Sequence, residues 1–460
     1  MCTISDSCRL LSVMTSRASL AVVGGALFFC LALVAGSQGK SAAPPDGFPF
    51  SIWLSHKEVT QIPWRFGVGR LSLRSDFRRA VSIGATIQDS EFEKDKDPDL
   101  VLYVRALESG RAIGPVFTVS ERDQRSPAPP EMRRNGFRWI NVPAIMQPGR
   151  YNIEVALLDR ATGRYNTSYE NVAIPGNSND ALERALAAGA QKVEFLQIPK
   201  PGARGSQVPP VEFQSISTFG LGVPTGLTLG GGGPRLSSTF LSGSDSAGIA
   251  SPAPRFPIDR PGVLKLSVIS VLSPPENRVE GGMTIGPFQN NLLGILTVLT
   301  RFDVLQGASD LTAIDLSDRS RPFDGANLKD VSVAALRQAL AKERTGLTLD
   351  DLRGIGSSGQ YLRSVLAERL HAAEADASGA THAIIVAGAR TEFPDSSKLT
   401  PIPAARDCHC KVFYVRFALI PNEKDDIPRL ISAYAPRVFE PLNWSEFRDQ
   451  FSTIYENLRR

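Results

Sequence analysis

The sequence predicts a multidomain chain with an N-terminal antiparallel β-sandwich and a C-terminal α/β domain built on a doubly wound sheet. Three observations support this prediction. Apolar and polar residues alternate over 44–176, the stretch 177–257 is rich in Gly, Pro and Ser, and strands alternate with amphipathic helices over 258–460. A length of 460 residues fits two or three domains at about 150 residues each.

Residues 1–43 read as an export signal or an N-terminal anchor. The run Ala18–Gly36 is apolar and uncharged, Arg9 and Arg17 precede it, and small residues at 34–37 fit a signal-peptidase site. The alternative is an uncleaved anchor, since 19 apolar residues approach the length that spans a bilayer. Both alternatives place the rest of the chain in the periplasm or outside the cell. A membrane is involved only through this segment, if it stays uncleaved.

The sandwich prediction rests on period-two patterns. "RAVSIGATI" (79–87) and "DLVLYVRAL" (99–107) alternate, and "FRWINVPAI" (137–145) continues the pattern. Two further runs within 148–174 flank "DRATG", a short connection that predicts a β-hairpin. We expect an immunoglobulin-like architecture without helices. The phrase "PGRYNIEVALLDRATGR" resembles strands of bacterial extracellular sandwich modules.

The composition of 177–257 is typical of a linker or of extended loops. One short helix is expected at 179–189. The segments 211–219 and 234–241 are strand-like, which predicts that part of this region joins a neighbouring sheet.

The α/β prediction depends on a change of period after residue 258. The closing helix carries Phe447, Phe451, Ile454, Tyr455 and Leu458 on one face. Together the elements predict a mostly parallel sheet with helices on both faces. They are, in chain order, strand 263–272, helix 288–302, strand 309–318, helices 331–343 and 359–378, strands 381–389 and 410–419, and helix 443–460.

This order of elements resembles the von Willebrand factor A domain, in particular the divergent versions carried by exported proteins of soil bacteria. The matching pieces are "LKLSVISVLSPPE", "DLTAIDLSD", "THAIIVAGA" and "SEFRDQFSTIYENLR". The resemblance implies a metal-dependent adhesion site. In such a site an Asp-x-Ser-x-Ser follows the first strand, a Thr and a second Asp come from later loops, and the partner's carboxylate completes the metal shell.

The metal-site motif is missing from this chain. The loop "SVLSPPE" offers Ser270, Ser273 and Glu276 but no Asp, and "VAGAR" (386–390) has none after the later strand. "DLSDR" (315–319) imitates the motif but follows a different strand and ends in Arg. A hard divalent cation needs anionic oxygen ligands. We therefore expect a degenerate loop without bound metal, and no cofactor.

The stretch "DCHC" (407–410) permits three interpretations. Cys408 and Cys410 form a disulfide, remain two reduced thiols, or belong with His409 to a metal or redox site. A zinc site would need two more ligands. The other histidines, such as His371 and His382, are more typical of surface or core packing.

The composition and the motifs of the sequence argue against several classes of function. The formal net charge is +4 and no basic stripe is present, which argues against nucleic-acid binding. Gly-x-Ser-x-Gly, His-Glu-x-x-His and Walker motifs are absent from the sequence. We expect an exported, non-catalytic interaction or scaffold protein that binds an envelope or extracellular protein or itself. The alternative is an envelope thiol-redox or metal-linked enzyme centred on 408–410.

Overall fold

A computed structural model describes most of the chain beyond the N-terminal region. The described residues are 55, 57–69, 71–74, 76–92, 98–124, 136–188, 190–196, 254–273, 285–341, 357–394, 396–404, 410–417 and 424–460. The chain divides into a unit Met1–Ser55 and a compact unit His56–Arg460, which holds all described helices and strands. The predicted export signal and the strand-like segments 211–219 and 234–241 lie outside the described residues. Within the described residues, no helix has the length and apolarity that crossing a bilayer requires.

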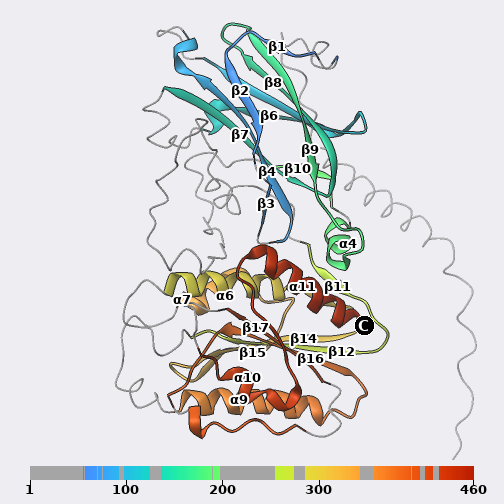
Figure 1. The fold of residues 1–460 in the computed structure, drawn as a ribbon, viewed down its shortest axis with the longest axis vertical. Coiled ribbons are helices and arrows are strands. Elements are labelled where there is room, and N and C mark those ends of the chain that lie inside the picture. The colour runs from blue at the N-terminus through green and yellow to red at the C-terminus, as the bar shows by residue number, and fades with distance from the viewer. Residues whose placement is uncertain are drawn as a thin grey trace, which may run out of the picture. The chain divides into compact units, whose positions relative to one another are not determined.

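Two antiparallel sheets form the first part of this unit (Figure 1). The first has the order β1-β9-β8-β5-β6 and the second has the order β10-β7-β4-β2, with β3 beside β4. The bounds are β1 (Val59–Thr60), β2 (Trp64–Val68), β3 (Ser72–Leu73), β4 (Arg79–Gln88), β5 (Leu100–Glu108), β6 (Arg111–Ser120), β7 (Phe137–Met146), β8 (Gly149–Asp159), β9 (Tyr165–Ile174) and β10 (Val193–Phe195).

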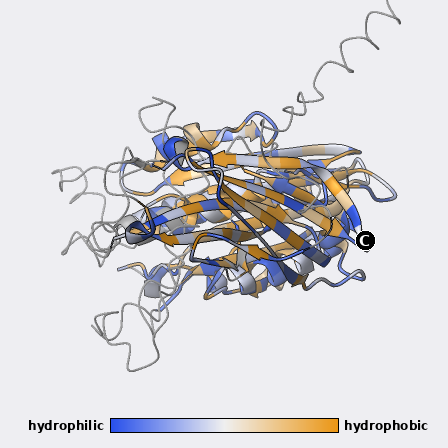
Figure 2. Cartoon of the chain, turned by 90° about the horizontal axis from the view of Figure 1, so that it is seen from above, coloured by the Kyte–Doolittle hydropathy of each residue, from blue (hydrophilic) through white to orange (hydrophobic). Residues whose placement is uncertain are grey.

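The two sheets pack face to face. Leu102 of β5 and Ile153 of β8 share one fully buried cluster with Ile83 of β4 and Val142 of β7. Figure 2 shows the alternation of hydrophobic and hydrophilic residues along the strands that produces this inner face. The prediction of antiparallel strands, including the hairpin β8–β9, is confirmed.

Two features of the sandwich differ from expectation. Strand β6 was not predicted, because Gly114 and Pro115 interrupt its alternation where the pairing with β5 shifts register. Such a bulge on an edge strand discourages pairing with other chains. Strand β10 lies inside the predicted linker 177–257 and pairs with β7, so part of that region joins a neighbouring sheet as expected, but through 193–195, a segment that was not predicted to be a strand.

The second part contains a mixed six-stranded sheet of order β15-β14-β12-β16-β17-β18. All neighbours are parallel except β14 and β15. The strands are β12 (Leu264–Val271), β14 (Gly307–Asp315), β15 (Ser320–Asn327), β16 (Thr381–Ala389), β17 (Cys410–Phe417) and β18 (Arg437–Phe439). A separate parallel pair joins β11 (Phe256–Ile258) to β13 (Phe302–Val304).

Helices lie on both faces of the mixed sheet (Figure 1). One face carries α6 (Ile285–Leu299), α7 (Val333–Ala341) and α11 (Trp444–Arg459), and the other carries α9 (Ser358–Glu374) and α10 (Ile427–Leu430). A further helix, α4 (Ala181–Ala187), precedes β10. Short 3-10 helices lie at Asp89–Glu91, Glu121–Gln124, Ser396–Lys398 and Ser432–Tyr434.

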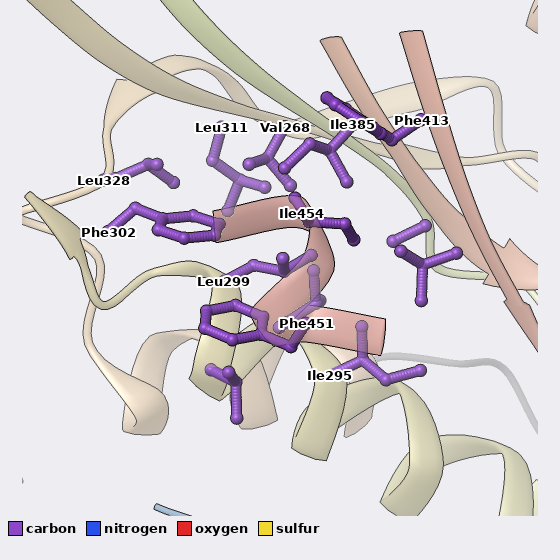
Figure 3. Close-up of a cluster of buried hydrophobic side chains, with 14 of the residues drawn as sticks. Val268, Ile295, Leu299, Phe302, Leu311, Leu328, Ile385, Phe413, Phe451 and Ile454 are labelled. Atoms are coloured by element: carbon purple, nitrogen blue, oxygen red, sulfur yellow. The ribbon is translucent and has the colours of Figure 1, made fainter. Parts of the chain in front are cut away.

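The central strands bury side chains on both faces. Along β12, Val268 faces α6 and α11, whereas Ile269 faces α9. This double burial explains the nearly continuous apolar runs in the sequence. Figure 3 shows Phe451 and Ile454 of α11 among side chains of α6 and the sheet. All five residues of the predicted apolar face of α11 are buried.

The sequence prediction missed β15 and β18. Pro322 and Gly325 break the strand pattern of β15, and β18 has only three residues. Both are edge strands, where burial imposes a weaker pattern on the sequence.

Phe77 joins the sandwich to the α/β part. It lies in the turn between β3 and β4, is fully buried, and belongs to the same core cluster as α11. Its ring centroid lies 5.3 Å from that of Phe451 and 5.6 Å from that of Phe447. The backbone of Phe77 has a φ of 63°, which costs a bulky residue about 1–3 kcal/mol. Burial of the ring offsets this cost.

Charged groups surround this aromatic contact. Arg448 of α11 pairs with Asp180 at 2.7 Å and with Glu183, which also binds Arg79 of β4. Asp180 in turn accepts a hydrogen bond from Leu182 N and so caps α4. Helix α4 therefore connects β4 of the sandwich to α11.

Replacing the buried ring tests its structural role. We expect Phe77→Ala to reduce the free energy of unfolding by about 3–5 kcal/mol, because it leaves a cavity between the two parts. Denaturant unfolding of the whole chain measures the effect. The half-exposed Tyr169 is the control, and Tyr169→Ala should change stability by less than about 0.5 kcal/mol. Equal effects of the two variants would contradict this role.

Asp76, beside Phe77, gives a pH dependence. Burial alone would raise the pKa of Asp76, but Arg74, Arg78 and Arg301 outweigh it and hold the pKa below its ordinary value. A lowered folded-state pKa stabilises the protein above about pH 4, and this stability is lost as the pH falls through the folded pKa. Unfolding curves between pH 7 and pH 3 should therefore show a smaller loss for Asp76→Asn than for the wild type. An identical loss in both proteins would refute this assignment.

Candidate functional site

The mixed sheet has a topological switch point between β12 and β16. The chain passes from β12 to β14 on one side and later returns to β16 on the other. In sheets of this kind, ligands bind outside the carboxyl ends of the strands at the switch point. Ser273 follows β12 here, Asp315 ends β14, and Arg390 and Thr391 follow β16. We call these four residues the switch-point edge.

Ser273 and Asp315 contact each other at this edge. The Ser273 hydroxyl donates to Asp315 Oδ1 at 2.7 Å and accepts from Leu316 N at 2.6 Å. The backbone N–H and the hydroxyl of Ser317 donate to the same Asp315 oxygen. Because β12 and β14 are parallel neighbours, their carboxyl ends lie together. Asp315, the first residue of "DLSDR", therefore lies beside Ser273 of the loop "SVLSPPE".

The three predicted loop residues are not brought together as a site. Ser270 lies inside the sheet, fully buried between Ala313 and Ala387 of the neighbouring strands. Its hydroxyl has no hydrogen-bond partner among the described residues. Ser273 lies at the edge instead, and Glu276 lies outside the described residues.

A guanidinium group stands at the end of β16. Arg390 binds Glu440, and Arg416 binds the other oxygen of Glu440 at 2.9 Å. Burial acts to raise the pKa of Glu440, but the two arginines outweigh it and hold this pKa below its usual value. Arg416 also pairs with Asp425 at 3.1 Å. Burial raises the pKa of Asp425 despite hydrogen bonds from the backbone N–H groups of Ile427 and Thr391.

This set of groups does not fit a hard divalent cation. Such an ion needs several oxygen ligands that are free to coordinate it. At the switch-point edge, Oδ1 of Asp315 already accepts hydrogen bonds from two serines, and Arg390 brings a positive charge. Among the residues that the structure describes, no group of three or more His, Cys, Asp or Glu side chains has the arrangement of a metal site.

Cys410, the last residue of the cysteine stretch, lies at the opposite edge of the sheet. Cys410 begins β17 and is disulfide-bonded. Its partner lies outside the described residues, as do Cys408 and His409, so the Cys408–Cys410 pairing stays a prediction. Cys410 is in register with His382 of β16, whose imidazole binds Asp376 at 2.6 Å. The sequence predicts a packing role for His382 and gives no sign of this contact with Asp376.

A small hollow lies between β7 and α4, next to Phe77. Met146, Gln147 and Leu186 line it. Its charged neighbours Arg79 and Glu183 already bind each other. The hollow therefore presents no unpaired charge from these two groups to a ligand.

No protein-family model matches this chain, and no curated protein matches it.

Glu440 holds the two arginines in place, and its replacement tests the network. We expect Glu440→Gln to lower the free energy of unfolding by about 1–3 kcal/mol, because two charge-assisted hydrogen-bond sets are weakened. Glu456→Gln is the matched control. Among the described residues the Glu456 carboxylate pairs with Arg460 alone, at 3.9 Å on the surface, so its loss should cost less than about 0.5 kcal/mol. The denaturant midpoints of both variants measure these effects. If Glu440→Gln leaves the midpoint unchanged, the network does not contribute to the stability of the fold.

Proposed function

We propose that this chain is an exported, non-catalytic interaction protein whose A-like domain binds a partner without a metal ion. The partner is an envelope or extracellular protein, or a second copy of the chain. The observation that carries the proposal is the Arg390–Glu440 pair at the end of β16. A fixed guanidinium stands where the resemblance requires an acidic metal ligand.

The sheet topology supports the resemblance to the A domain. The predicted strands at 263–272, 309–318, 381–389 and 410–419 are neighbours in the order that a doubly wound sheet requires. Helices cover both faces, and the closing helix packs through the predicted residues. The two packed antiparallel sheets support the immunoglobulin-like sandwich in the same way.

Recognition at the switch-point edge would rely on hydrogen bonds and charge. The loops near it carry Lys424, whose side chain is 78 % exposed, and the exposed Arg319. Arg390 and Arg416 are partly exposed and are held by Glu440. Charged side chains at a rim steer a partner and set its orientation. A partner bound this way does not depend on free divalent cations.

Capture of partners from an envelope extract tests the proposal. Tagged wild-type chain, with and without EDTA, is compared with a Lys424→Glu, Arg319→Glu double variant, and bound proteins are identified by mass spectrometry. We expect a partner that survives EDTA and whose recovery falls at least about tenfold with the double variant, as rim charge reversals repel a complementary surface. Analytical ultracentrifugation covers self-association.

The control variant lies at the amino ends of the strands, opposite the switch-point edge. Leu305 is 54 % exposed beside the amino end of β14, and Leu305→Glu should leave the recovery unchanged. Loss of the partner in EDTA would mean that a cation is required. Equal loss with Leu305→Glu would mean that the switch-point edge is not the binding surface.

A further inference from the structure

Basic side chains gather at the last turn of α11, beside the amino end of β17. Lys411, the second residue of β17, donates from Nζ to Asn457 O at 2.7 Å, and Arg437 of β18 donates to Asn457 Oδ1 at 2.9 Å. Arg459 and Arg460 are exposed in the same turn, and the side chain of Arg460 is 81 % exposed. Two strands and one helix thus bring four cationic side chains to one helix end.

The turn between β11 and β12 adds a fifth cation. The Tyr455 hydroxyl donates to Pro257 O at 2.7 Å, which holds this part of the chain against the last turn of α11. Arg260 lies three residues further on, and its Nε donates to Pro261 O at 3.4 Å. Arg260 Nη1 is buried and has no hydrogen-bond partner among the described residues. Because a buried donor without a partner is costly, this nitrogen is suited to an acceptor from a ligand.

Nearby carboxylates do not balance these five cations. They are Glu456, which pairs with Arg460 at 3.9 Å, and the exposed Asp259. The end of α11 itself carries about half a negative charge, which accounts for one of the cations at most. Burial, and after it the charges of Arg260 and Arg460, lower the pKa of the Lys411 ammonium group. The three cations are therefore close enough to repel one another, and a bound anion would relieve this repulsion.

Two exposed apolar side chains lie beside the basic residues. Val263 follows Arg260 by three residues and is 47 % exposed, and Leu305 is 54 % exposed. The backbone N–H of Leu264 donates to Gln306 O at 2.9 Å, so the segments that carry Val263 and Leu305 are neighbours. Exposed apolar side chains next to cations suit the boundary between the head groups and the acyl chains of a lipid bilayer.

We propose that Arg260, Lys411 and Arg460 form a binding site for a phosphate-bearing anion, either free phosphate or the head group of an anionic lipid. Guanidinium and ammonium groups make charge-assisted hydrogen bonds to phosphate oxygens. The proposal goes beyond the interaction function, since it concerns the amino ends of the strands and a ligand that is not a protein. Val263 and Leu305 favour the lipid as the source of the phosphate, because free phosphate gains nothing from apolar neighbours.

Sedimentation of the full-length chain with lipid vesicles tests the lipid source. Vesicles of phosphatidylcholine set the baseline, and vesicles that also contain phosphatidylglycerol should bind the chain more tightly, with a gain that shrinks as salt is added. The double variant Arg260→Gln, Arg460→Gln should lower the affinity for the anionic vesicles about tenfold, because each basic side chain near an anionic surface contributes to binding. Glu456→Gln should raise this affinity, because it removes a carboxylate that competes for Arg460.

Thermal unfolding in phosphate and in chloride of equal ionic strength tests the free anion. Phosphate stabilises folded proteins in general, so the difference between the wild type and the double variant is the measure of binding. With the lipid as the source, this difference is absent and vesicle binding depends on the two arginines. With free phosphate as the source, phosphate raises the Tm of the wild type more than that of the double variant, and the anionic vesicles give no gain.

The double variant Arg111→Gln, Arg150→Gln is the matched control. It removes the same charge from two exposed positions of the sandwich, and both readouts should coincide with the wild type. Circular dichroism confirms that each variant is folded. If the Arg260→Gln, Arg460→Gln variant fails to fold, Arg460→Gln alone decides, with an expected loss of about threefold. The proposal is overturned if neither readout depends on Arg260 and Arg460, or if the sandwich variant lowers binding equally.

Discussion

The central strands of the mixed sheet bury side chains on both faces, and this constraint fixes what the edges of the sheet carry. Leu266 and Val268 of β12 pack under α6 and α11, while Ile269 packs under α9. A slip of one residue would exchange the two faces of a strand, and a longer slip would break the fit on both faces, so the register is strongly specified. The carboxyl ends of β12, β14 and β16 consequently lie together, and so do the amino ends of β16 and β17.

The carboxyl and amino ends of the central strands differ in chemistry, because the residues that follow these strands differ from those that precede them. At the carboxyl edge, Ser273 is hydrogen-bonded to Asp315 and Arg390 is paired with Glu440. At the amino edge, a carboxylate orients an imidazole in register with a disulfide sulfur. Phe77 holds the sandwich against α11, on one face of this sheet.

Much of the fold could be predicted from the sequence, and little of the site. The spacing of hydrophobic residues predicted strand 381–389 and the apolar face of the closing helix, because extensive burial requires a strong hydrophobic pattern in the sequence. Strand β18 left no such pattern. Arg390 and Glu440 are fifty positions apart, and no local pattern links them. Asp376 and His382 are close in sequence, but only the turn after α9 brings the carboxylate back to the ring. The hydrogen bond between Ser273 and Asp315 can be predicted only if β12 and β14 are known to be neighbouring strands.

The central claim is that the switch-point edge works without a metal ion, and direct cation binding tests it most closely. Isothermal titration calorimetry of the full-length chain with Mg²⁺, Ca²⁺ and Mn²⁺ is the measurement, with Ser273→Ala titrated alongside. The account predicts no saturable heat for any of the three ions up to millimolar concentration. A saturable one-site isotherm that disappears in Ser273→Ala would contradict it, because Ser273 and Asp315 would then be ligands and not a closed hydrogen-bonded pair.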